Sequence, residues 1–140
     1  MDRKSSYIID SSNGAETARL IDQDTMLTQA TGVFPASLDL SDVYRLLDVA
    51  CGPGGWAREA AQQLPDSSVI GIDIQRDMIN YANACVQVMR LENLSFQVMD
   101  VTQPLAFADA SFDLVHARFL VGVLYKQTWP FVVQEYTRIT

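Results

Sequence analysis

The chain has 140 residues, of which 49% are hydrophobic and 19% are charged, and its formal net charge is −7. These values are typical of one globular domain, and the negative charge argues against a nucleic-acid substrate, because nucleic-acid binding needs basic residues to neutralise phosphates. The longest apolar run is far shorter than the ~20 residues of a membrane helix, and the first residues do not follow a signal-peptide pattern. We therefore expect a cytoplasmic protein without a membrane partner. Cys51 and Cys85 lack metal-ligand spacing, so we expect reduced cysteines and no metal.

The first 43 residues are expected to form a helical lid and a connecting loop. Within residues 16–31, Leu20, Ile21 and Leu27 recur at roughly helical spacing, which predicts one amphipathic helix. Gly32 and Pro35 follow as helix breakers. Residues 44–140 are expected to complete one structural domain.

From Tyr44 onward, short apolar runs alternate with helical patterns. Runs rich in Val, Ile, Leu and Phe predict strands at residues 44–49, 69–72, 94–98 and 112–115. Apolar residues at helical spacing predict helices that begin near Trp56 and Met78, and a third helix over residues 129–139. This alternation predicts an α/β fold with a parallel sheet and right-handed crossovers.

A glycine-rich turn, DVACGPGG, spans residues 48–55 between the first predicted strand and the first predicted helix after it. Gly52 and Gly54 allow a tight turn and a close backbone approach to a ligand, and the helix N-terminus favours an anionic group. Asp73 ends the next strand 19 residues beyond Gly54, where a carboxylate can accept hydrogen bonds from ribose hydroxyls. Capping the following helix is the alternative role of Asp73. The pattern therefore indicates a nucleoside-containing ligand.

The same turn leaves a second class of ligand open. Gly52, Gly54 and Ala57 also satisfy the dinucleotide pattern G-x-G-x-x-A, which is weak on its own. Asp48 lies at the strand end, where its carboxylate would repel a pyrophosphate. This charge disfavours a dinucleotide-binding domain.

Four motifs in succession resemble those of the class I S-adenosylmethionine-dependent methyltransferases. They are RLLDVACGPGGWA at 45–57, VIGIDIQRDMINYA at 69–82, LSFQVMDVTQPLAF at 94–107 and SFDLVHARFLVGVL at 111–124. The resemblance extends from Glu16 to the last residue. It implies a Rossmann-like, doubly wound parallel sheet of strand order 3-2-1-4, and S-adenosyl-L-methionine as the cofactor.

The resemblance also implies the residues that contact this cofactor. The methionine end would lie against Asp48 and His116 and against the backbone of Ala50, Cys51, Gly52 and Gly54. Asp73 would bind the ribose hydroxyls. The adenine would be bordered by Ile74 and Met78, with Asp100 accepting from its amine and the Val101 backbone pairing with its ring edge. The cationic ammonium and sulfonium of this cofactor would be attracted by Asp48.

Members of the family continue beyond the last helix predicted here with three further strands. We therefore expect the C-terminal strands of the full fold to be missing, and the strand at 112–115 to form an unpaired sheet edge. Such an edge invites pairing, so we expect a possible homodimer through it.

The implied function is methyl transfer to an unidentified, small-molecule acceptor. The sequence HARF stands at 116–119, where methylases of amino groups in bases and glutamine carry an Asn/Asp-Pro-Pro-Tyr signature. This difference disfavours bases and glutamine as substrates. No catalytic residue is assigned, because alignment of the donor and the nucleophile is the main requirement. Arg118 is expected to be solvated, and binding of an acidic group of the substrate is its alternative role. A cofactor-binding fragment without catalysis is the alternative.

Overall fold

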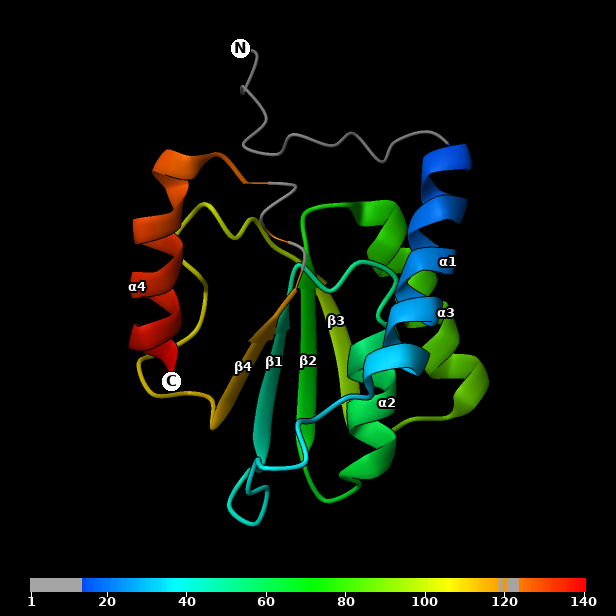
Figure 1. Cartoon of the computed structure of the whole chain (residues 1–140), viewed down its shortest axis with the longest axis horizontal. Coiled ribbons are helices and arrows are strands. Elements are labelled where there is room, and N and C mark those ends of the chain that lie inside the picture. The colour runs from blue at the N-terminus through cyan, green and yellow to red at the C-terminus, as the bar shows by residue number, and fades with distance from the viewer. Residues whose placement is uncertain (1–13, 119, 121–123) are drawn as a thin grey trace.

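The chain forms one layered α/β unit in the computed structural model, which describes residues 14–118, 120 and 124–140 (Figure 1). The elements in chain order are α1 Gly14–Thr31, β1 Arg45–Val49, α2 Gly55–Gln63, β2 Ser68–Asp73, α3 Arg76–Met89, β3 Leu94–Val98, β4 Leu114–Ala117, the short 3-10 helix η2 Lys126–Thr128, and α4 Trp129–Ile139. Every predicted strand and helix is present. The first 13 residues lie outside the described part.

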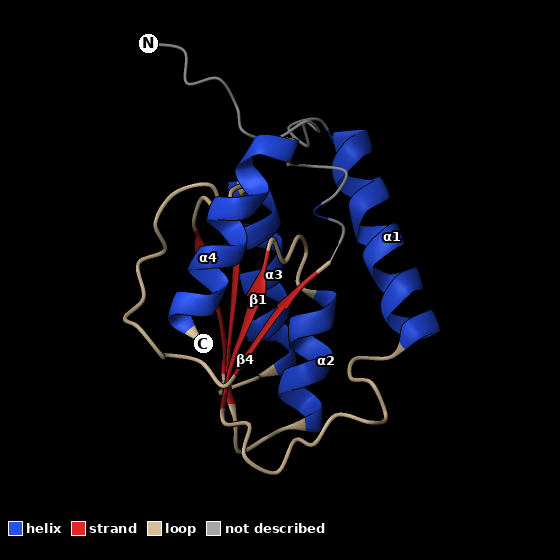
Figure 2. Cartoon of the chain, turned by 60° about the vertical axis from the view of Figure 1, so that its left-hand side comes forward, coloured by secondary structure: helices blue, strands red, loops and turns tan. Residues whose placement is uncertain are grey.

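The four strands form one parallel sheet in the order β3-β2-β1-β4. This order confirms the prediction of a Rossmann-like, doubly wound sheet. Helix α4 covers one face, whereas α2 and α3 cover the other and α1 lies outside α2 (Figures 1 and 2). None of the described helices is long and apolar enough to cross a membrane.

The predicted start of the fourth strand was two residues too early. Phe112 donates its N–H to the carbonyl of Ile139 in α4 at 3.0 Å, so it does not join the ladder. The side chain of Asp113 accepts hydrogen bonds at 2.9 Å from the backbone N–H groups of Tyr44 and Arg45. The backbone N–H of Asp113 also donates to the Arg45 carbonyl at 2.8 Å, and β4 begins at the next residue, Leu114.

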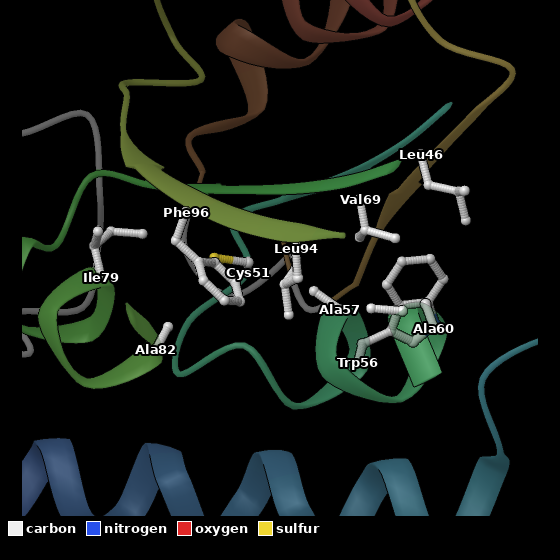
Figure 3. Close-up of a cluster of buried hydrophobic side chains, with 11 residues drawn as sticks. Leu46, Cys51, Trp56, Ala57, Ala60, Val69, Ile79, Ala82, Leu94 and Phe96 are labelled. Atoms are coloured by element: carbon white, nitrogen blue, oxygen red, sulfur yellow. The ribbon is translucent and has the colours of Figure 1, made fainter. Parts of the chain in front are cut away.

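Two apolar cores lie on the two faces of the sheet. Alternation along β1 directs Leu46 into the core under α2 and α3 and Leu47 into the core under α4, and both are fully buried. Figure 3 shows the first core, in which Trp56 and Phe96 are the largest side chains. Burying a side chain of this kind stabilises the fold by roughly 1.5–3 kcal/mol.

One row of residues crosses the whole sheet and leads to the candidate site. The strand register places Phe96, Gly71, Asp48 and His116 beside one another, from β3 through β2 and β1 to β4. Gly71 has no room for a side chain, because a Cβ there would lie 2.4 Å from the ring of Phe96. The aromatic ring therefore fills the space over β2, and the two polar members of the row lie together on β1 and β4.

Candidate functional site

The loop after β1, residues 50–54, has an unusual backbone. Ala50, Gly52 and Gly54 have positive φ angles of 52°, 54° and 86°, a region that L side chains rarely adopt. Cys51 donates its N–H to the carbonyl of Ile72 at 2.9 Å, which fixes the loop to the end of β2. The thiol of Cys51 is buried in the first core, and burial raises its pKa well above the ordinary value. Its side chain therefore packs as an apolar group.

The glycines of this turn have different reasons to lack a side chain. A Cβ at Gly52 would meet nothing within 4 Å, so the backbone there is open to a ligand. A Cβ at Gly54 would lie 2.5 Å from Phe96, and one at Gly55 would lie 2.1 Å from the carboxylate of Asp24. Gly52 is thus the position that suits close ligand approach, whereas packing within the protein requires the other two.

Asp73 connects the glycine loop to the start of α3. Its Oδ2 accepts a hydrogen bond from the Gly52 N–H at 2.9 Å, and its Oδ1 accepts one from the Gln75 N–H at 2.8 Å. The second bond reaches two residues along the chain, which makes it an Asx-turn. The N-cap of α3 is Gln75, so Asp73 lies two residues before this position, and its side chain supports the helix start through the Gln75 N–H. Each carboxylate oxygen keeps a further lone pair that can accept a bond from a ligand.

The ionisation of Asp73 gives a test through pH. Burial raises its pKa, hydrogen bonds from the backbone N–H groups of Gln75, Gly52 and Ile74 oppose the rise, and the nearby charge of Asp48 adds to it. The ionised form is the better acceptor for ribose hydroxyls. We expect the affinity for adenosylhomocysteine to fall as the pH decreases below this raised pKa, by up to about tenfold per pH unit. Calorimetry from about pH 8 to about pH 5 measures this fall.

Protonation of Asp73 has opposite effects on ligand affinity and on folding: it weakens ligand binding but favours the folded state. Since the folded carboxyl of Asp73 holds its proton to a higher pH than the unfolded one, its contribution to the free energy of unfolding is lost as the pH rises through the raised pKa.

Asp73→Asn cannot titrate at this position, so it serves as the control for the pH dependence of the affinity. An acid-side loss of affinity equal in both proteins would contradict the assignment.

Asp48, which is buried, and His116, which is half-buried, form a hydrogen-bonded pair toward the carboxyl ends of β1 and β4. Asp48 is 2% exposed, and its Oδ1 lies 2.8 Å from His116 Nδ1. Burial raises the pKa of Asp48, while the hydrogen bond and charge of His116 oppose the rise. The His116 ring stacks on Trp56 with 3.9 Å between centroids, and Trp56 donates to the Val33 carbonyl at 2.8 Å. The carboxylate of Asp48 is therefore hydrogen-bonded to the His116 ring, and each of the two side chains holds the other in place.

The residues expected around an adenine follow β2 and β3. Met99 donates its N–H to the Asp73 carbonyl at 3.0 Å, which places Asp100 beside the end of β2. Asp100 Oδ1 already accepts hydrogen bonds from Thr102, through its N–H at 2.9 Å and its hydroxyl at 2.6 Å.

The other three residues expected around the adenine differ in burial. Ile74 is half-buried. The side chains of Met78, in α3, and Val101, in the second core, are almost fully buried. The structure thus brings these segments to one edge of the sheet.

Sequence reasoning missed two residues at this edge. Asp24, in α1, is 9% exposed, and its Oδ2 accepts the Gly55 N–H at 2.8 Å. Arg118 Nη2 donates to Asp24 Oδ1 and to Thr28 Oγ1, both at 2.7 Å. The expectation that Arg118 is solvated was therefore wrong. An N–H at the start of α2 is bonded to a carboxylate of the protein itself. No local pattern in the sequence indicates this contact, because Asp24 and Arg118 lie 94 positions apart.

Comparisons with known proteins agree on one family. The model of the family described as "Methyltransferase domain" matches residues 46–140. The chain is 34% identical over 86 residues to methyltransferase str3 of Strobilurus tenacellus, covering 61% of this chain and 28% of the relative. It is 29% identical over 106 residues to methyltransferase str2 of the same organism, covering 76% of this chain and 36% of the relative.

A solved structure supports the fold. The TehB-like SAM-dependent methyltransferase from Corynebacterium glutamicum superposes with a TM-score of 0.65 and 20% identity, covering 91% of this chain and 68% of that structure. The chain spans about a third of the length of the two curated relatives. The family model matches more than half of the chain. The chain therefore belongs to the methyltransferase domain family, and its fold is that of the class I enzymes, which use S-adenosylmethionine.

Proposed function

We propose that this chain binds S-adenosylmethionine at the carboxyl ends of β1 and β2 and takes part in methyl transfer to a small-molecule acceptor. One observation carries the proposal: the buried carboxylate of Asp73 ends β2 and accepts the Gly52 N–H, and a Cβ at Gly52 would meet nothing within 4 Å. An acceptor for ribose hydroxyls and an accessible backbone turn thus lie side by side. These are the two features that a nucleoside cofactor needs from this fold.

The described residues have distinct roles in this proposal. The backbone of residues 50–54 and the Asp48–His116 pair hold the methionine end, where carboxylates attract the ammonium and the sulfonium. Asp73 binds the ribose. The adenine lies against Ile74 and Met78, near Asp100 and the Val101 backbone.

The charge of the site suits a cationic ligand. Two carboxylates, those of Asp48 and Asp73, are at most 8% exposed, and the Gly52 hydrogen bond holds the glycine loop beside Asp73. A pyrophosphate would need N–H donors at the start of α2, where Asp24 already accepts the Gly55 N–H. Both observations favour adenosylmethionine over a dinucleotide.

The bound cofactor supplies an activated methyl group on its sulfonium. The part of the chain's own residues is to bind the cofactor, orient it and exclude water, so positioning is the main contribution that we propose. The two curated relatives are named only as methyltransferases, and neither name states an acceptor. The small-molecule acceptor, like turnover by this chain, is thus part of the proposal.

Three further expectations belong with this proposal. β4 is the end strand of the described sheet, so a second copy could pair with it and form a homodimer. We also propose a cytoplasmic location. The division into a lid at residues 1–43 and a partial methyltransferase domain at residues 44–140 is a proposal as well, supported by the position of α1 outside α2.

Calorimetric titration tests the binding step. We expect adenosylmethionine and adenosylhomocysteine to bind saturably with one site per chain, and a nicotinamide dinucleotide to give no signal. Dinucleotide binding alone, or no binding of either adenosyl ligand, would contradict the proposal. Detection of adenosylhomocysteine with a panel of small oxygen, nitrogen, sulfur and carbon acceptors then measures turnover.

A further inference from the structure

Helix α1 is joined to the proposed site by a group of polar contacts, here called the Asp24 cluster. It consists of Asp24 and Thr28 from α1, the Gly55 N–H at the start of α2, and Arg118 directly after β4. The contacts measure 2.7–2.8 Å and link residues up to 94 positions apart. Figure 1 shows α1 running beside α2. The cluster thus connects three segments that are separate in the sequence.

The burial pattern of α1 differs from that of a helix that only packs on a domain. The buried residues of α1 are Asp24 and Thr28, which are both polar, whereas Met26 is 72% exposed. A helix held by the hydrophobic effect buries an apolar stripe. Leu20, Ile21 and Leu27 are only half-buried, so the most deeply buried positions of α1 carry hydrogen-bonding groups, and directional contacts contribute to the position of the helix.

The contact between Asp24 and Gly55 leaves no room for a side chain at position 55. A Cβ at position 55 would lie 2.1 Å from Asp24 Oδ2. The carboxylate thus occupies the space that a side chain would need, and it accepts the N–H that begins α2. Asp24 therefore sets the position of the residue that directly follows the glycine loop.

The cluster also reaches the pair that is proposed to hold the methionine end. Arg118 lies two residues beyond His116 on the same segment, and Asp48 is bonded to His116. The charges of Asp24 and Arg118 both act on the ionisation of Asp48, in opposite directions. Moving either partner would therefore shift the backbone after β4 and the field at Asp48.

We infer that Asp24 and Arg118 are positioning residues for the proposed cofactor site, holding α1, the glycine loop and the end of β4 in the arrangement that binds the methionine end. This inference rests on the proposed function. Neither residue needs to touch the ligand. The Asp24 cluster acts through Gly55 on one side and through the segment after His116 on the other.

Substitutions that keep side-chain size test the inference. Asp24→Asn retains an acceptor for the Gly55 N–H but removes the ion pair, and Arg118→Gln removes the charge from the other side. Arg19→Gln is the matched control, because Arg19 forms an ion pair with Glu16 on the same helix, with its side chain 51% exposed. The dissociation constant of adenosylhomocysteine is measured well below the unfolding temperature, and circular dichroism verifies the fold.

We expect Asp24→Asn and Arg118→Gln to weaken adenosylhomocysteine binding by about tenfold or more while folded, and Arg19→Gln to leave it unchanged. A purely structural role would lower the unfolding temperature but keep the dissociation constant within twofold of wild type, which would overturn the inference. Where the two variants do not fold, Arg118→Lys decides: it keeps a positive charge opposite Asp24 but changes the shape and reach of the group that contacts Asp24 and Thr28, and about threefold weaker binding is expected. Equal binding by Arg118→Lys would then reject the inference.

The two levels of proposal separate in the same experiment. A wild-type chain that binds neither adenosyl ligand overturns the proposed function and, with it, the role of the cluster. A wild-type chain that binds, with variants that bind equally well, overturns the role of Asp24 and Arg118 alone.

Discussion

Replacement of Asp73 by alanine is expected to weaken the binding of adenosylmethionine and adenosylhomocysteine by at least about 100-fold, because two charge-assisted hydrogen bonds to ribose hydroxyls are lost at about 1.5–3 kcal/mol each. The carboxylate also accepts the Gly52 and Gln75 N–H groups. Alanine therefore releases the glycine loop as well. Calorimetry measures the dissociation constants of both ligands.

Asp77→Ala is the matched control for this substitution. Asp77 is an exposed aspartate in the first turn of α3, only four positions further along the chain. Its removal costs the helix about 0.3–1 kcal/mol through the loss of a favourable charge near the N-terminus, and we expect unchanged affinity. If Asp73→Ala bound either ligand as tightly as Asp77→Ala, the ribose assignment would be wrong.

A methyl group at position 71 is expected to destabilise the whole domain. In Gly71→Ala the new Cβ would lie 2.4 and 2.5 Å from two ring carbons of Phe96 and 3.1 Å from the Cys51 sulfur. These atoms are buried in the first core (Figure 3), so they cannot move aside freely. Overpacking of this kind costs roughly 1–3 kcal/mol, out of a typical ~5–15 kcal/mol for a native domain. Urea unfolding followed by circular dichroism measures the change.

A double-mutant cycle identifies the cause of that loss. Phe96→Leu removes the ring that the new methyl group meets, so Gly71→Ala should cost less in the Phe96→Leu background than in wild type. Gly14→Ala is the control for adding a methyl group, since a Cβ there would meet nothing within 4 Å. Additive costs in the cycle would refute the steric explanation.

Much of the fold could be predicted because its signals are local. Alternating apolar runs indicated all four strands, and the family motifs indicated their order, which the sheet confirms. The start of β4 could not be predicted, since it depends on Asp113 bonding across to Tyr44 and Arg45. An aspartate within an apolar run does not show which distant N–H groups it will satisfy.

In the candidate site, too, features with local sequence signals could be predicted, whereas contacts between distant residues could not. The close approach of Asp73 to the glycine loop was predictable from spacing, whereas the Asp24–Arg118 contact joins positions 94 apart and leaves no local pattern. The reason for Gly54 was also hidden, because it depends on where the Phe96 ring lies. Cofactor contacts at Asp48, Asp100, Val101 and His116 stay predictions until a ligand is measured.

The contact between Asp24 and Gly55 has a consequence for how such chains diverge. The two positions share one small volume, and a side chain at position 55 would fill the space that the carboxylate now occupies. A related chain that acquires alanine or serine at 55 must therefore have lost or withdrawn the carboxylate at 24. Substitutions at these two positions should accumulate together, although 31 positions separate them along the chain.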